Sequence, residues 1–144
     1  MSKQKTCEER VDEILASVAS DMTQYMEDPN DEDIAFEGSD SLEVGPLTEY
    51  GLSFDYCGPD EEEEEAGDWS GEYFRFQISW GGPSSEIRFY SNGRIEYVFM
   101  DWYDGATRDI TNEDWAAWLA DFFCVDDYHF GEARDSWLSM GRIA

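Results

Sequence analysis

The stretch SSEIRFYSNGRIEYVFMDW, residues 84–102, alternates apolar and polar side chains on both sides of an Asn-Gly pair. The apolar positions that share one face are Ile87, Phe89, Ile95, Tyr97 and Phe99. Such alternation indicates half-buried strands, and Asn-Gly between two of them is a strong signal for a tight type I′ hairpin turn. The stretch therefore predicts two antiparallel strands, at about residues 85–91 and 94–102.

Two further strands are predicted before this hairpin. Alternating apolar residues predict one at about 72–80 and another at about 50–57; these residues are Phe74, Phe76, Ile78 and Trp80 in the first and Leu52, Phe54 and Tyr56 in the second. WGGPSS, residues 80–85, turns the chain into the next strand, and DGATRDI, residues 104–110, is expected to break the last one. The sheet is expected to be a four-stranded antiparallel meander.

Helices are predicted on both sides of the strands. Thr6 and Glu9 fit a capping box, and apolar residues then recur at steps of three and four, which predicts a helix over about 7–27. Thr111 is expected to cap a helix over about 112–124, whose apolar face holds Trp115, Trp118, Leu119, Phe122 and Phe123. A short last helix is expected near 132–140. This order predicts a single α+β domain, 1–144, with the helices packed on one face of the sheet.

The composition predicts a folded protein with a very acidic surface. The chain of 144 residues is 41% hydrophobic and 16% aromatic, unlike disordered chains, although its net charge is -26. Its three cysteines, Cys7, Cys57 and Cys124, form no metal or disulfide pattern, so we interpret them as reduced, buried thiols. Neither a signal peptide nor a membrane span is recognisable in the sequence, and we expect a cytoplasmic protein.

The acidic charge is concentrated in the N-terminal half. Residues 11–74 contain 21 Asp and Glu and no Lys or Arg, whereas residues 75–144 contain 12 acids and six arginines. Binding to nucleic acid or to an anionic membrane requires cations, so both partners are disfavoured. The charge favours a basic protein partner, approached with electrostatic steering.

The residues offer little for catalysis. His129 is the only histidine, and nothing near it in sequence suggests a catalytic triad or a metal site. The segment that starts at Asp28 resembles a calcium loop, but Asp33 stands where an EF-hand needs glycine. We interpret Asp101 and Asp104 as turn formers rather than catalytic acids. We therefore expect neither an enzyme nor a cofactor.

Two acidic segments, at about 28–45 and 58–70, flank the first predicted strand. Carboxylates on one strand face repeat at about 6.6 Å, and helix neighbours at i, i+4 lie roughly 5 to 6 Å apart at Cβ. Both spacings approach the roughly 7 Å between duplex phosphates. GPDEEEEEAGDW, residues 58–69, is interpreted as a flexible link that adds a long-range field, while the acids before it form the better ordered surface.

The candidate partner-binding residues are the acids of this region, with three aromatic residues as interface anchors. The acids are Asp12, Glu13, Asp21, Glu27, Asp28, Asp31, Glu32, Asp33, Glu37, Asp40, Glu43, Asp60, Glu61, Glu62, Glu63, Glu64, Glu65 and Asp68. The aromatic residues are Trp69, Trp102 and Tyr103, which lie beside acids near strand ends.

In size, charge and α+β organisation the chain resembles the small phage and plasmid proteins that mimic DNA to block restriction enzymes or CRISPR effectors. Residues 78–90 (ISWGGPSSEIRFY) and 95–106 (IEYVFMDWYDGA) are also similar to a pattern of small plasmid and phage proteins. The resemblance implies an inhibitor, monomeric or homodimeric, that occupies the basic nucleic-acid-binding surface of a host defence protein.

Two other interpretations stay open. An immunity or antitoxin-type protein that covers a cationic toxin needs the same charge, but in a local patch with aromatic anchors. A salt-adapted domain is also acid-rich, and the chain has two lysines against seven arginines. Salt adaptation, however, predicts acids spread over the whole surface.

Overall fold

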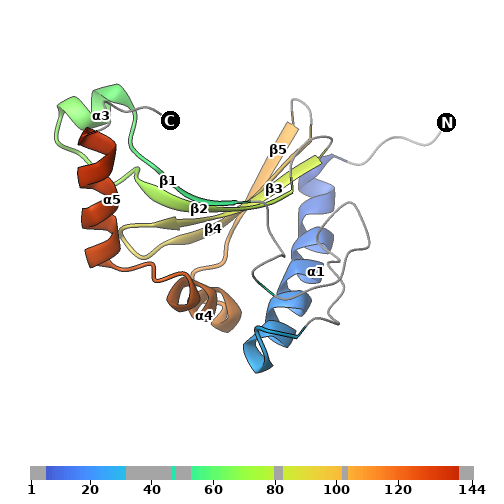
Figure 1. The fold of residues 1–144 in the computed structure, drawn as a ribbon. Coiled ribbons are helices and arrows are strands. Elements are labelled where there is room, and N and C mark those ends of the chain that lie inside the picture. The colour runs from blue at the N-terminus through green and yellow to red at the C-terminus, as the bar shows by residue number, and fades with distance from the viewer. Residues whose placement is uncertain (1–5, 32–46, 48–52, 80–82, 102–103, 140–144) are drawn as a thin grey trace.

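The computed structural model of the chain describes residues 6–31, 47, 53–79, 83–101 and 104–139 (Figure 1). The helices and strands follow in the order α1 (Cys7–Glu27), β1 (Ser53–Cys57), α3 (Glu61–Glu65), β2 (Tyr73–Ser79), β3 (Pro83–Tyr90), β4 (Ile95–Asp101), β5 (Asp104–Asp109), α4 (Asp114–Phe122) and α5 (Asp127–Ser139). A helix, an antiparallel sheet and further helices therefore confirm the predicted α+β class.

The sheet is an open antiparallel meander in which each strand pairs with the next along the chain, in the order β1-β2-β3-β4-β5. The prediction of four strands is wrong, because DGATRD forms β5 instead of breaking the sheet. Asp101 pairs with Asp104, and β5 runs antiparallel to β4 from that pair onward. The pattern of β5 is faint because Ala106 is its one buried side chain, and Asp-Gly is a strong turn signal.

The turn between β3 and β4 differs in type from the prediction. The Gly93 N–H donates to the carbonyl of Tyr90, and the Tyr90 N–H donates to the carbonyl of Arg94 at 2.9 Å. Gly93 has φ of +92°, whereas Asn92 is not among the described non-glycine residues with positive φ. A type I′ turn needs positive φ at both central residues. The loop is therefore a type I turn followed by a glycine bulge, and Asn92 caps it by accepting from the Arg94 N–H at 3.0 Å.

One face of the sheet forms the core with the helices. Phe74 and Phe76 on β2 share this face with Phe89 on β3, and all three are buried. α5 reaches the same face, since the ring centroids of Phe130 and Phe74 lie 4.6 Å apart. Figure 1 shows α1, α4 and α5 on this side of the sheet. The predicted placement of the helices on one face agrees with this packing.

α1 has the bounds and the cap that its sequence predicts. The Thr6 hydroxyl oxygen accepts from the Glu9 N–H at 3.3 Å, and the same hydroxyl donates to the Glu9 carboxylate at 3.2 Å. Val11, Val18 and Met22 on its inner face are fully buried. The Asp104 carboxylate accepts from the Cys7 N–H at 2.7 Å, so the start of β5 holds the start of α1.

The C-terminal helices depart from the prediction in detail. Glu113, not Thr111, is the N-cap residue of α4, and the Thr111 hydroxyl instead accepts from the Ile95 N–H at 3.0 Å, which ties the helix entry to β4. Phe122, expected in the core, is 36% exposed, because α4 turns it away from the sheet. Cys124, two residues after the last residue of α4, has φ of +58° and is exposed, contrary to the expected burial. α5 begins at Asp127, earlier than expected.

Candidate acidic interface

The arginines of the described residues are all engaged by carboxylates of the same chain. The pairs are Arg10 with Asp101, Arg75 with Asp55, Arg88 with Glu86, Arg94 with Glu96, Arg108 with Glu8 and Asp12, and Arg134 with Glu72. Glu72, Glu86 and Glu96 are buried. These cations therefore neutralise acids that the fold itself holds in place, and they do not offset the acids of α3.

Three of these pairs occupy the sheet face opposite the core. Arg75, Arg88 and Arg94 stand there beside Tyr73 and Tyr90, and the two tyrosine rings lie 5.3 Å apart. The Arg88 guanidinium lies 4.8 Å from the Tyr73 ring centroid, and that of Arg94 lies 5.1 Å from the Tyr90 ring centroid. This face therefore mixes both charges and is a poor imitation of a phosphate array.

The acids of α1 gather at its two ends. Glu9, Asp12 and Glu13 are exposed near its start, and Glu27 and Asp28 at its end. The exposed positions between these groups are uncharged: Ala16, Ser20, Thr23, Gln24 and Met26. At 1.5 Å per residue the two groups are separated by about 21 Å along the axis, so α1 alone offers no continuous track of carboxylates.

Two acids of α1 are less available than the sequence suggests. Asp21, predicted on the outer face, is only 1% exposed, because the helix turns this position toward the body of the protein. Asp12 is exposed but accepts from the Arg108 guanidinium at 2.9 Å, so part of its charge is offset. Asp28 is the C-cap residue of α1 and accepts from the Asn30 N–H at 3.0 Å.

Seven of the predicted site residues lie outside the described residues. They are Glu32, Asp33, Glu37, Asp40, Glu43, Trp102 and Tyr103. The side chain of Glu64, within α3, lies outside them as well. Asp31, the last described residue before the first gap, is half-buried.

The glutamate run is helical, which corrects its interpretation as a flexible link. Asp60 caps α3 by accepting from the Glu63 N–H at 2.8 Å. Gly67, with φ of +73°, ends it, and the Asp68 N–H donates to the Glu63 carbonyl at 2.8 Å. An aspartate before the run and a glycine after it are helix start and stop signals. These signals are present in the sequence, but a run of five like charges is usually disordered, and this leads to the prediction of a flexible link.

The acids of this turn form a local cluster, the α3 cluster, defined as Asp60, Glu61, Glu62, Glu63, Glu65 and Asp68. Glu62 and Glu65 are exposed. The pKa of Glu63 is raised, first by its hydrogen bond with Asp60, then by burial and by the charges of Asp60 and Asp68. The pKa of Asp68 is lowered, because the Ser70 hydroxyl and N–H both donate to its carboxylate. The cluster is therefore an ordered concentration of negative charge.

Trp69 follows Asp68 of this cluster in the chain, and Arg134 covers one side of its ring. The Arg134 guanidinium lies 4.8 Å from the ring centroid. Arg134 is in turn held by Glu72, which is 0% exposed and also accepts from the Tyr56 hydroxyl at 3.0 Å. Glu72 and Arg134 carry no sequence signal that marks them as a pair, because they are 62 residues apart.

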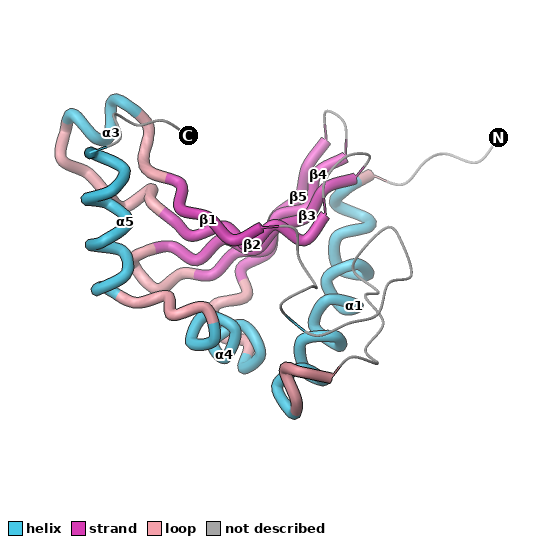
Figure 2. Tube along the Cα trace, in the orientation of Figure 1, coloured by secondary structure: helices cyan, strands magenta, loops and turns pink. Residues whose placement is uncertain are grey.

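The structure separates the acids that the sequence places in one region. α1 and α3 lie at opposite ends of the molecule in Figure 2, with the sheet between them. The acids of α1 and the α3 cluster therefore cannot contact one compact patch on a partner, although both contribute to the long-range field.

The described residues form no metal-binding group and place the one histidine in a capping contact. Within them, no group of three or more His, Cys, Asp or Glu is arranged to hold a metal ion. The Asp126 carboxylate accepts from the backbone N–H of His129 at 2.8 Å, which is a capping contact at the start of α5, and the Nδ1 atom of His129 lies 2.7 Å from the same carboxylate oxygen. No described helix is long and apolar enough to cross a membrane.

Comparison with known proteins adds no relative. No protein-family model matches the chain, and neither a curated protein nor a solved structure matches it.

Proposed function

We propose that the protein is an inhibitor that presents carboxylates to the basic nucleic-acid-binding surface of a defence protein, of the anti-restriction or anti-CRISPR type. The observation that carries the proposal is the commitment of all described arginines to acids within the fold, beside a chain charge of -26. A surface built for phosphates would leave such cations available. A surplus of fixed negative charge instead favours a cationic partner.

The α3 cluster is the surface that supports this proposal best. Its carboxylates stand on a capped helical turn, where neighbours three and four residues apart have Cβ atoms about 5 to 6 Å apart. That spacing is close to the roughly 7 Å implied for successive phosphates of a duplex strand. The uncharged middle of α1 makes that helix a weaker imitation, and its acids act mainly through the field.

A competition assay tests the proposal. The protein is titrated into complexes of labelled duplex DNA with a restriction endonuclease and with a guide-loaded CRISPR effector, and release of the DNA is followed by anisotropy. Release is expected for at least one effector. It should weaken at least tenfold when salt rises from about 0.05 M to about 0.5 M, because screening shortens the reach of the field. Failure to release DNA from any effector of the panel, or release indifferent to salt, contradicts the proposal.

Matched charge variants locate the surface. Glu62→Gln with Glu65→Gln removes two charges from the α3 cluster, and Asp114→Asn with Asp121→Asn removes two exposed charges from α4. If the α3 cluster makes the contact, the first pair weakens inhibition about tenfold or more, and the second less than twofold. Equal effects would mean that only the total charge matters and would reject the α3 cluster as the site.

Trp69 supports a second candidate, an immunity-type protein that neutralises one cationic toxin. Its half-buried ring beside Asp68 suits a local patch with one aromatic anchor. In that case Trp69→Ala should abolish protection of cells from the toxin while duplex release is absent even in the wild type. Duplex release that survives Trp69→Ala would favour the first candidate.

A further inference from the structure

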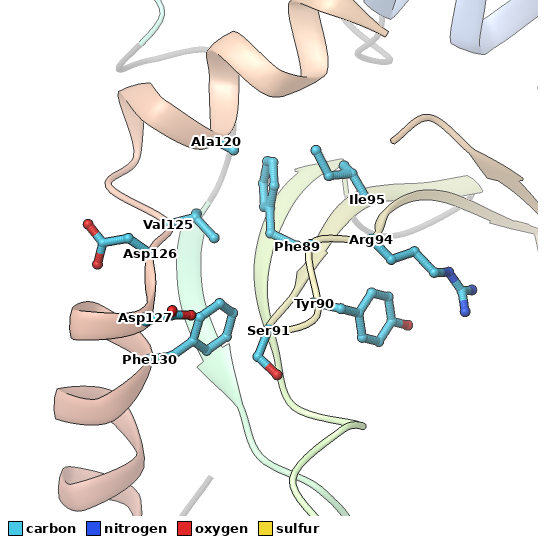
Figure 3. Close-up of a pocket in the computed structure, with 11 residues that line it drawn as sticks. Phe89, Tyr90, Ser91, Arg94, Ile95, Ala120, Val125, Asp126, Asp127 and Phe130 are labelled. Atoms are coloured by element: carbon cyan, nitrogen blue, oxygen red, sulfur yellow. The ribbon is translucent and has the colours of Figure 1, made fainter. Parts of the chain in front are cut away.

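A cavity opens between the turn that joins β3 to β4 and the junction of α4 with α5 (Figure 3). Its apolar lining comes from four elements of the fold: Phe89 and Ile95 of the hairpin, Ala120 of α4, Val125 of the junction and Phe130 of α5. Figure 3 shows these side chains directed toward the cavity. Phe89, Ile95 and Phe130 are buried members of the core, so the floor is fixed by the fold.

The volume of the cavity sets the size of its ligand. It measures about 170 Å³. A protein cavity of about 150 Å³ lined by Leu, Ile and Phe holds one benzene molecule, and here an apolar floor of similar size is completed by polar residues at the mouth. Sites for drug-sized ligands and cofactors are larger, about 300 to 1,000 Å³. One phenyl ring or one branched aliphatic side chain therefore fits, and a nucleotide does not.

The charged residues at the mouth of the cavity determine which ligand charge is favoured. The Arg94 side chain extends away from the cavity in Figure 3 and is engaged by Glu96 and by the Tyr90 ring. Asp126 also points away and contacts His129. The Asp127 carboxylate turns toward the cavity beside Phe130. An apolar group with a neighbouring cation is therefore favoured, and an anion is repelled by Asp127 and by the net charge of -26.

We propose that this cavity binds one ring-sized apolar side chain, flanked by lysine or arginine, of the cationic partner protein. The inference rests on the proposed function and adds a specific anchor to it: long-range charge brings the partner near, and the cavity selects which basic surface stays bound. Buried apolar anchors of this kind contribute a large share of the binding free energy of protein interfaces, while charges at the rim mainly determine the association rate.

Two short peptides test the cavity on the protein alone. Acetyl-Lys-Phe-Lys-amide and acetyl-Lys-Ala-Lys-amide carry the same charge and differ by one ring. Titrations followed by amide NMR shifts should give at least tenfold tighter binding of the Phe peptide, because burial of a phenyl side chain is favourable. The shifts should centre on Gly93, Val125 and Phe130. Equal binding of the two peptides, or shifts centred on α3, overturns the inference.

Variants separate the cavity from the general charge. Ala120→Leu adds a good helix former that fills the cavity from α4, so the preference for the Phe peptide should disappear. Asp127→Asn should weaken the Phe peptide about two- to fivefold, as expected for an exposed ion pair. Asp135→Asn, an exposed control two turns further along α5, should leave its binding unchanged. A Phe preference that persists in Ala120→Leu contradicts the inference, and Asp127→Asn tests it even if Ala120→Leu fails to fold.

The DNA-release assay distinguishes failure of this inference from failure of the proposed function. If Ala120→Leu releases duplex DNA as well as the wild type, the anchor is wrong and the inhibitor proposal stands. If the wild type prefers the Phe peptide but releases no duplex from any effector, the inhibitor proposal fails, and the partner assigned to the cavity fails with it.

Discussion

Replacement of Arg134 by methionine should cost the protein a large part of its stability. The Arg134 guanidinium donates to both carboxylate oxygens of Glu72, one of these contacts being 3.3 Å, and Glu72 is 0% exposed. The Tyr56 hydroxyl also donates to this carboxylate, at 3.0 Å. Methionine keeps much of the apolar length of the side chain but removes the cation. Glu72 is then left as a buried charge beside a neutral donor.

The structure sets the size of the effect. Loss of one partner of a buried ion pair costs about 3 to 5 kcal/mol. Here the Arg134 side chain is 35% exposed, so water reaches the site once the cation is removed, and we expect the low end, about 3 kcal/mol. A protein of roughly this size loses about 2 to 4 °C in Tm per kcal/mol, which gives a fall of about 6 to 12 °C.

Urea denaturation at pH 7 measures this cost, with Arg75→Met as the matched control. Arg75 forms a similar two-contact pair with Asp55, at 2.8 and 3.3 Å, but the Asp55 side chain is 43% exposed and can be rehydrated. The control should therefore lose less than about 1 kcal/mol. Adding Glu72→Gln to Arg134→Met should restore part of the loss, because the buried charge is then gone. Equal losses in Arg134→Met and Arg75→Met, with unchanged m-values, would refute the reasoning.

Three further predictions concern pH, the α3 cap and salt. Burial raises the pKa of Tyr73 and of Tyr97 to about 12, whereas the pKa of an unfolded tyrosine is about 10. The stability that depends on the protonated phenols is therefore complete below pH 10 and should be lost as pH rises toward 12. Phenolate absorbance and unfolding curves measured over this pH range test the prediction, which is wrong if all tyrosines titrate near pH 10 without loss of stability. Asp60→Ala removes the acceptor of the Glu63 N–H and should speed hydrogen exchange in α3 at least threefold, as expected for a cap that contributes about 1 kcal/mol; unchanged exchange would argue against an ordered cap. The fold should persist in dilute buffer, with Tm rising as salt screens self-repulsion, whereas unfolding at low salt by circular dichroism would favour the salt-adapted interpretation.

The sequence alone determines the α+β class, the bounds of α1 and the strands β2 to β4. These elements are predictable because their signals are local: a capping box, a helical apolar repeat, and alternation on either side of a glycine turn. β5 is not predictable in this way, because an edge strand with one buried alanine has little periodicity. α3 is not predicted, because a run of five glutamates usually indicates disorder and outweighs the cap signals on either side of it.

The tertiary structure alone decides which charges remain for a partner. Sequence counts the acids before Arg75 as one basic-free region, but the fold places α1 and α3 at opposite ends of the molecule (Figure 2). It buries Asp21, pairs Asp12 with Arg108, and assembles the cavity from the hairpin and the C-terminal helices. Ion pairs and cavities join residues far apart in the chain, so no local pattern encodes them. Composition sets the total charge, and packing sets where that charge can act.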